Sequence, residues 1–297
     1  MTKHSETESL FQSQKFTDWP TVTEALNAKE IGAAFILAPL AMELAKNTGM
    51  IRIVYLGHRD GTAIIVRTDS DIRDFGDLRG KTVAIPSRYA NQNLLMHKMM
   101  KEWDMPFDSI ELRELPPPDH PTALSEGSID GYIVGEPFAA KAEVDGFGRV
   151  LYLTKDIWPN FISCVLVVRE DLIETDRELI QELVDGIAKS GKWLDQDQSH
   201  RMDAAEIAAE HYYFQDPELL KFVLSKPVDR VKYTDLAPLK DDFDEIMELG
   251  VEIGVLSGSI AFEDYVDDSF VRSLDELDWN MNRLPRPDDE SDQEGDS

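Results

Sequence analysis

The sequence predicts an α/β protein with two lobes, and three observations support that class. Strand-like runs alternate with helical segments between about residues 80 and 170, a pattern typical of an α/β fold with a mostly parallel sheet. A less complete block of the same kind precedes this stretch, and a helical region follows it. With 297 residues, 42% of them hydrophobic, the chain is long enough to bury two cores. We therefore expect two mixed or parallel sheets with flanking helices and a helical C-terminal region.

The individual elements follow from hydrophobic periodicity, β-branched runs and turn residues. In the first block the pattern predicts helices at 21–27 and 39–46 and strands at 32–37, 51–56 and 62–67. In the alternating block it predicts strands at 82–85, 110–115, 131–134, 149–153 and 164–169, with helices at 88–103, 119–126 and 137–144. Helical periodicity then runs through 179–194, 204–213, 217–224 and 239–256.

Extended segments near 62–67 and 158–168 are the expected crossings between the two lobes. They divide the chain into a first lobe of residues 16–66 and 160–284, and a second lobe of residues 67–159. Ligands of such lobes sit at the carboxyl ends of strands and at helix N-termini, so the cleft between the lobes is the expected site. From Pro285 the sequence PRPDDESDQEGDS has six acidic and no apolar residues, so 285–297 is expected to be a disordered acidic tail.

The composition excludes several classes of partner. The formal net charge is −28, from 58 acidic and 30 basic residues, which disfavours nucleic acid and anionic membrane surfaces. No apolar run reaches the ~18 residues of a membrane span, so no membrane insertion is expected. The N-terminal sequence is polar and shows no signal peptide, so the chain as given is expected to stay where it is made. Cys164 is the only cysteine, which excludes a disulfide within the chain.

The stretch IPSRYANQNLLMHKMM places polar and aromatic residues at the start of an expected helix. Ser87 is the expected N-cap, Arg88 adds a cation, and Gln92 lies one turn further along on the same side. Together with the positive end of the helix, these groups would form a seat for a small anion. The alternative is an ordinary capped helix with a solvated arginine.

Other stretches are expected to shape the cleft. Glu136 lies beside the positive end of the helix that Pro137 begins, where it could contact a ligand or a neighbouring cation. Trp158 is expected either in the core or as an aromatic wall of the pocket. His120 is expected to be exposed in the first turn of its helix. The sequence has no GxSxG, HExxH, CxxC or glycine-rich phosphate loop, so no enzyme activity, cofactor or metal is expected.

Three segments, DLRGKTVAIPSRYANQNLL, ELPPPDHPTALSEGSIDGYIVGEPFAAKA and TKDIWPN, resemble the solute-binding proteins of ABC importers for nitrate, sulfonates, taurine and bicarbonate. The segment EALNAKEIGAAFILAPLAM is similar to the first lobe of that family. The resemblance implies a type II periplasmic-binding fold that closes on a small polar or anionic ligand, and docking on a membrane permease. It also implies a periplasmic or cell-envelope location. The ligand-binding residues that it implies are Leu37, Ala38, Pro39, Ser87, Arg88, Tyr89, Gln92, Gly135, Glu136, Trp158 and Asn160.

The sequence departs from the family pattern at two places. Gln92 stands where nitrate-binding relatives are expected to carry a histidine, and the opening β–α unit of the family is not visible in this sequence. Two alternatives to an importer component follow. One is an enzyme on the same fold that resembles the synthases of the thiamine pyrimidine precursor, which would need a reactive histidine. The other is a cytoplasmic ligand sensor, which would need a signalling or DNA-binding module.

Overall fold

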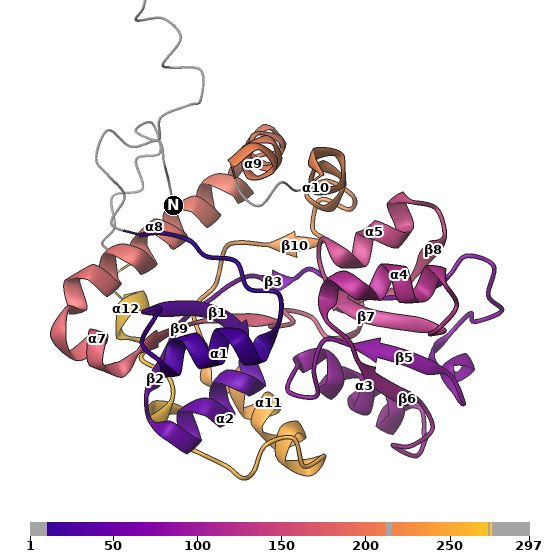
Figure 1. The fold of residues 1–297 in the computed structure, drawn as a ribbon, viewed down its shortest axis with the longest axis horizontal. Helices are drawn as coiled ribbons and strands as arrows, with labels where there is room; N and C mark the ends of the chain where they lie inside the picture. Colours follow the sequence, from indigo (N-terminus) through magenta and orange to yellow (C-terminus); the bar gives the residue numbers. More distant parts are fainter. Residues whose placement is uncertain (1–10, 212–215, 273, 275–297) are drawn as a thin grey trace, which may run out of the picture.

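The described residues form two larger β-sheets that lie side by side, each with its own helices, and a separate two-stranded sheet (Figure 1). The structure is a computed structural model, and it describes residues 11–211, 216–272 and 274. We call the part built on the three-stranded sheet the first lobe, and the part built on the five-stranded sheet the second lobe. The α/β class with two sheets is confirmed. The expected acidic tail at 285–297 lies outside the described residues.

The first lobe contains the sheet of β1 (Ala33–Leu37), β9 (Cys164–Arg169) and β2 (Ile51–Leu56). Strand β9 lies in the centre and runs antiparallel to both neighbours, with Ile36 opposite Val165 and Ile53 opposite Val167. The expectation of a mostly parallel sheet is therefore wrong for this lobe. The chain returns from the second lobe through β9. This strand therefore runs opposite to β1 and β2, which precede the crossing into the second lobe.

The second lobe contains the sheet of β6 (Glu111–Glu114), β5 (Thr82–Ile85), β7 (Gly131–Gly135), β4 (Thr62–Arg67) and β8 (Gly148–Leu153), in that order. Strand β5 is parallel to β6 and β7, whereas β4 is antiparallel to β7 and β8. The expected boundary put 62–66 in the first lobe, and the pairing of β4 contradicts it. Each residue of β4 is hydrogen-bonded within the second sheet, so this segment is a central strand and not a crossing.

The crossings lie just before β4 and just before β9. Strand β3 (Arg59–Asp60) pairs antiparallel with β10 (Val231–Lys232), and Arg59 also forms an isolated bridge with Ile162. Both segments that join the lobes therefore run next to each other. The first crossing also pairs with the short β10, which comes from the C-terminal part of the chain.

Helices cover both sheets and extend the C-terminal part (Figure 1). Around the first sheet lie α1 (Trp19–Asn27), α2 (Ala38–Thr48), α7 (Glu170–Thr175), α8 (Arg177–Gln196), α11 (Lys240–Glu252) and α12 (Ser269–Arg272). With the second sheet lie α3 (Asn91–Glu102), α4 (His120–Ser125), α5 (Phe138–Val144) and α6 (Thr154–Ile157). Helices α9 (Gln198–His211) and α10 (Pro217–Val223) form a further layer that packs on α5. Short 3₁₀ turns lie at Phe75–Leu78, Pro117–Asp119 and Phe262–Asp264.

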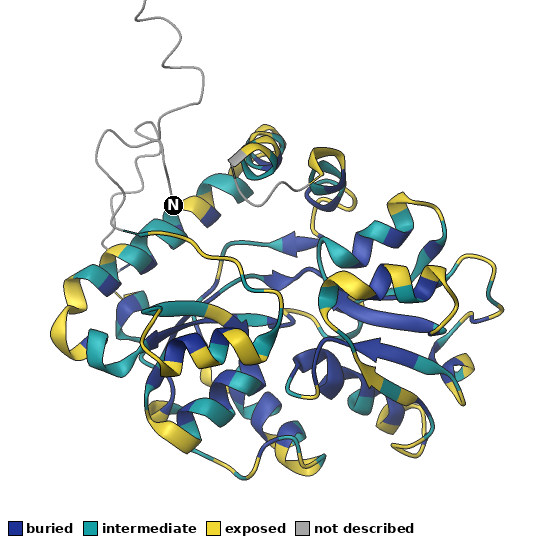
Figure 2. Cartoon of the chain, in the orientation of Figure 1, coloured by how far each residue is buried: buried dark blue, intermediate teal, exposed yellow. Residues whose placement is uncertain are grey.

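Each lobe buries its own apolar core, visible as the dark blue strands and inner helix faces of Figure 2. In the first lobe, Ile36, Val165 and Val167 of the sheet pack with Met42 of α2 and Phe243 of α11. Burial of such side chains contributes about 1.5–3 kcal/mol each, so these cores fix the strands that carry the crossings. Within the described residues, no helix combines the length and the apolar character that crossing a membrane requires.

Two expectations for helix starts need correction. Helix α3 begins at Asn91 instead of residue 88, because Ser87 to Ala90 form a turn in which the amide of Ala90 donates to the carbonyl of Ser87. The hydroxyl of Ser87 accepts from the amide of Tyr89 inside that turn, so it is not the helix cap. His120 does start α4, but it is fully buried and not exposed.

Candidate functional site

Two amide side chains at the start of α3 reach across to the crossing that leads into β9. Asn91 donates its Nδ2 to the carbonyl oxygen of Ile162. Gln92 donates its Nε2 to the hydroxyl of Ser163 at 3.1 Å and lies 3.5 Å from the hydroxyl of Thr62. Asn91 and Gln92 are each only 1% exposed. The first turn of α3 is therefore attached to the segment that joins the lobes through buried polar contacts.

Each of these amides also carries a buried oxygen without a hydrogen-bond partner among the described residues, Oδ1 of Asn91 and Oε1 of Gln92. A buried acceptor of this kind costs about 1–3 kcal/mol when it stays unpaired. For Asn91 the orientation of the amide is set by Ile162, because a carbonyl oxygen can only accept. Asn91 therefore keeps a buried acceptor at the start of α3 that no described residue satisfies.

A cavity of about 320 Å³ lies beside Asn91, between α3, the crossing after α6 and α11. Ligand pockets in proteins span roughly 300–1,000 Å³, so this cavity suits a small molecule. Trp158 forms one wall, with its indole Nε1 donating to Glu245 at 3.2 Å and its ring in edge contact with Phe161. The residues that line the cavity are Asn91, Lys98, Glu102, Ile157, Trp158, Pro159, Asn160, Ile162, Asp242, Glu245 and Ile246.

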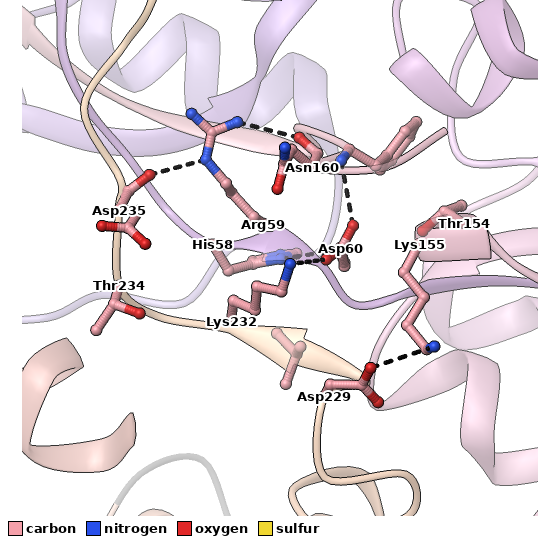
Figure 3. A network of polar contacts seen from close by, with 12 residues as sticks. His58, Arg59, Asp60, Thr154, Lys155, Asn160, Asp229, Lys232, Thr234 and Asp235 are labelled. Atoms are coloured by element: carbon pink, nitrogen blue, oxygen red, sulfur yellow. Dashed lines mark hydrogen bonds and ion pairs between the residues drawn. The ribbon is translucent and has the colours of Figure 1, made fainter. Parts of the chain in front are cut away.

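The crossings behind the cavity are held by a polar network (Figure 3). The guanidinium of buried Arg59 donates to the carbonyl oxygens of Asp235 at 2.8 Å, Asn160 at 3.1 Å and Ala237 at 3.3 Å. It also pairs with the carboxylate of Asp242 at 2.9 Å. Four oxygens thus hold this cation, three from residues 235–242 and one from Asn160. Arg59 therefore positions Asn160 at the cavity wall.

Asp60 and His58 complete the network at the first crossing. Asp60 accepts from the amide of Phe161 at 3.2 Å and lies 3.3 Å from the ammonium of Lys232 (Figure 3). Burial lowers the pKa of His58, whose Nδ1 lies 3.1 Å from the carbonyl oxygen of Asp60. His58 is therefore uncharged near neutral pH, and the charges at this crossing are Arg59, Asp60 and Lys232.

Only some of the ligand-binding residues implied by the family resemblance lie at the cavity. Trp158 and Asn160 line it, and Gln92 belongs to the adjoining amide contacts. Leu37, Ala38 and Pro39 are buried where β1 meets α2, and the amide of Ala38 donates to the carbonyl of Ser163 at 3.3 Å. These three residues do not line the cavity, although they approach the same crossing.

Arg88 and Tyr89 form a unit of their own outside the cavity. Arg88 is exposed, and its guanidinium lies 4.8 Å from the ring of Tyr89 and donates to its hydroxyl at 3.0 Å. The backbone amide of Arg88 donates to Glu114 at 2.8 Å. The expectation that Arg88 and Gln92 share one side of a helix is wrong, because Arg88 precedes the helix.

Glu136 also has a partner that the sequence did not indicate. It follows Gly135 at the end of β7, and its carboxylate pairs with the Nε of Arg230 while accepting from the amide of Ala140 at 2.8 Å. Burial raises the pKa of Glu136, and the guanidinium of Arg230 acts against that effect. Glu136 is therefore engaged in an ion pair and does not line the cavity.

The sequence interpretation missed Asn91, Lys98 and Glu245 as cavity residues. A signal for Asn91 was present, because three amide residues, Asn91 to Asn93, stand directly before an apolar run. Lys98 and Glu245 lie on helices almost 150 residues apart in sequence, and nothing local indicates that α3 and α11 meet. Among the described residues, no group of three or more His, Cys, Asp or Glu side chains could hold a metal ion.

Comparisons with known proteins place this geometry in a class of binding proteins. Residues 5–209 match the model of the NMT1-like family, and the chain belongs to that family. A curated relative, the nitrate import ATP-binding protein NrtC of Synechocystis, is 25% identical over 214 residues, which are 66% of this chain. The match spans only 32% of the length of NrtC.

Solved structures share the fold over most of the chain. The ligand-binding component of an ABC-type import system from Staphylococcus aureus, solved with zinc bound, has a TM-score of 0.78 and 28% identity. The similarity covers 88% of this chain and 87% of that one. The periplasmic nitrate-binding protein NrtA from Synechocystis has a TM-score of 0.78 at 15% identity, over 91% of this chain and 81% of its own. The expected resemblance to solute-binding proteins of ABC importers is confirmed.

Proposed function

We propose that this protein is the solute-binding component of an ABC import system and that it takes a small polar solute at the cavity between its lobes. The observation that carries the proposal is the position of Asn91 and Gln92. Both stand on the second lobe and contact the crossing that leads into the first, and Asn91 lines a cavity of about 320 Å³. A ligand that binds there touches both lobes, so binding and lobe closure are coupled.

The remaining parts of the proposal follow from the relatives. The loaded protein would dock on the permease of the importer and act on the outer side of the membrane, the side on which the periplasmic protein NrtA lies. The site residues proposed for the solute are Gln92, Trp158 and Asn160, joined by Asn91. Arg88, Tyr89 and Glu136 have other partners and are not proposed to contact it.

The enzyme alternative receives no support from the site. It requires a reactive histidine, and the amide of Gln92 stands in that place, which can neither serve as a nucleophile nor transfer a proton near neutral pH. The cavity also lacks the arrangement of nucleophile, base and orienting group that acyl or group transfer needs.

Two measurements test the proposed function. The first is isothermal titration calorimetry of the full chain with small polar solutes of both charges. The second is the ATPase activity of the reconstituted importer with and without the loaded protein. Saturable binding together with stimulated ATP hydrolysis is the expected result. Absence of both over the whole solute panel would overturn the proposal.

A further inference from the structure

The two lobes are joined by more than the two crossings. The chain leaves the core of the first lobe after α8, which contributes Val184, and enters that core again at Leu236 after β10. The described residues between these points, 198–211 and 216–232, carry α9, α10 and β10, and we call them the brace. Figure 1 shows α9 and α10 on one side of the crossings and α3 and α11 on the other. The brace therefore lies away from the cavity between α3 and α11.

The brace packs on the second lobe through an apolar cluster of its own. Leu219 and Val223 of α10 are buried in this cluster together with Ala140 of α5. Ala142 of the same helix belongs instead to the core of the second sheet. One face of α5 thus covers the sheet and another receives α10. The apolar side chains of α10 lie outside the cores of the two sheets and are buried because the brace is docked.

Ion pairs fix the position of the brace on the second lobe. Arg230, in the loop before β10, pairs with Glu136 at the end of β7 and lies 3.4 Å from Glu143 of α5. Its neighbour Asp229 lies 3.3 Å from the ammonium of Lys155 on α6. Arg230 and Glu136 have lost their hydration, so each depends on the other staying in place.

The other end of the brace is attached to the first lobe. Arg201 of α9 pairs with Asp195 near the end of α8, and these side chains are only 7% and 11% exposed. The guanidinium of Arg201 also donates to the carbonyl oxygens of Val231 at 3.1 Å and Leu224 at 3.3 Å. Asp195 accepts in turn from the amide of Tyr233 at 2.7 Å. A single buried ion pair therefore joins α8, α9, the end of α10 and β10.

We propose that the brace is a third connection between the lobes and that it restrains their rotation about the crossings. Two extended crossings alone would leave the lobes free to turn, because a few residues absorb such a motion. A rotation that separates α3 from α11 also changes the angle between α8 and α5, and the brace is attached to both helices. The restraint therefore keeps the walls of the cavity in the arrangement described above.

The restraint also has a consequence for solute binding. An arrangement that is populated only in part weakens the apparent affinity by that fraction, so a restrained pair of lobes favours binding. The inference goes beyond the proposed function, because it concerns the lobes with or without a solute. Its test needs none.

The test measures the distance between the lobes in the full chain by double electron–electron resonance. Spin labels are attached at Glu182→Cys on α8 and at Ser125→Cys on α4, which are exposed positions on the first and the second lobe. Cys164, the only cysteine of the sequence, is replaced by alanine so that the labels attach at these two positions alone. With the brace intact, a single narrow distance distribution is expected.

One substitution releases the brace and a chemically identical one serves as its control. Val223→Asp brings a charge into the apolar cluster with Ala140, and it should give a broad distribution with distances that the intact chain does not reach. Val228→Asp makes the same change at a side chain that is 58% exposed in the loop before β10, and it should leave the distribution narrow. Leu219→Ala thins the cluster without adding a charge and should broaden the distribution less than Val223→Asp. Circular dichroism verifies that each variant is folded.

Two results would overturn the restraint. One is a distribution that is already broad with the brace intact. The other is the same distribution for Leu219→Ala or folded Val223→Asp as for Val228→Asp. Neither result affects the proposed function, because the calorimetric panel tests solute binding separately.

Discussion

Glu136 and Arg230 form an ion pair that is almost completely removed from solvent. The side chains are 6% and 2% exposed, and they join the end of β7 in the second lobe to the loop before β10. Arg230 also lies 3.4 Å from Glu143 and stacks on the ring of Phe222. A charge buried in this way depends on its partner, because each ion has lost its hydration.

The first prediction concerns the removal of one partner. Glu136→Gln or Arg230→Met should each reduce the free energy of unfolding by about 3–5 kcal/mol, because the remaining charge stays buried and unpaired. The double variant should recover a substantial part of that loss. Urea unfolding followed by circular dichroism measures all three. The control is Asp244→Asn at the exposed pair with Lys240, where no measurable change is expected. Single variants as mild as this control would contradict the buried pairing.

The sequence predicted most elements but could not predict how they meet. Strands such as β5 and β4 were placed at 82–85 and 62–67 as observed, because β-branched runs bounded by turns are a local signal. The direction of β9 is not local, since it depends on the return of the chain from the second lobe. For the same reason a mostly parallel sheet was expected where β9 makes the first sheet antiparallel.

The same limit applies to the site. Gln92, Trp158 and Asn160 were proposed from short motifs, and the structure places them at or beside one cavity, while their role in binding stays a prediction. The hydrogen-bond partners of Glu136 and Asn91 are 94 and 71 residues away in sequence, and no local sequence pattern predicts these contacts. A cation near a helix start predicts a ligand contact for Arg88, but the turn at 87–90 precedes α3 and leaves this side chain exposed.

The second prediction contrasts Arg88 with Gln92. Arg88→Ala should change neither solute affinity nor stability measurably, because the side chain is exposed and rests on Tyr89. Gln92→Leu should weaken binding about threefold to tenfold, which corresponds to the ~0.5–1.5 kcal/mol of one buried hydrogen bond. Calorimetry with the solute identified in the panel measures both. A loss of affinity in Arg88→Ala larger than that in Gln92→Leu would mean that Arg88 belongs to the anion seat that the sequence predicts.

The third prediction concerns the pH dependence of stability at His120. Burial lowers the pKa of His120 to about 4, while its Nε2 donates to the carbonyl of Leu115 at 3.0 Å. An unfolded histidine has a pKa near 6.5, so between these values the unfolded chain binds a proton that the folded chain does not. The contribution of the buried, neutral His120 to the free energy of unfolding is therefore complete above about pH 6.5 and falls as the pH decreases toward 4.

The difference between wild type and His120→Gln isolates this effect, because the carboxylates titrate in both proteins. Between pH 7 and pH 5, wild type should lose about 2 kcal/mol more unfolding free energy than the variant. Gln is chosen because its amide can still donate to Leu115. Urea unfolding in a series of buffers gives both profiles, and parallel profiles would show that folding does not lower the pKa of His120.

The last prediction concerns Gly191 in α8, where two effects of opposite sign compete. Alanine favours a helix interior over glycine by about 1 kcal/mol, so Gly191→Ala would stabilise an isolated α8. In this fold, a Cβ at position 191 would overlap the backbone carbonyl oxygen of Tyr233, which has no rotamer to change. The segment after β10 would have to move, and it is held by the amide of Tyr233 donating to Asp195 at 2.7 Å. Overpacking costs about 1–3 kcal/mol and the lost hydrogen bond about 1 more, so a net destabilisation of about 2 kcal/mol is expected.

Ser190→Ala, on the exposed side of the same helix, is the control and should change stability little. Equal midpoints of urea unfolding for Gly191→Ala and Ser190→Ala would mean that α8 does not pack against the segment after β10 as described.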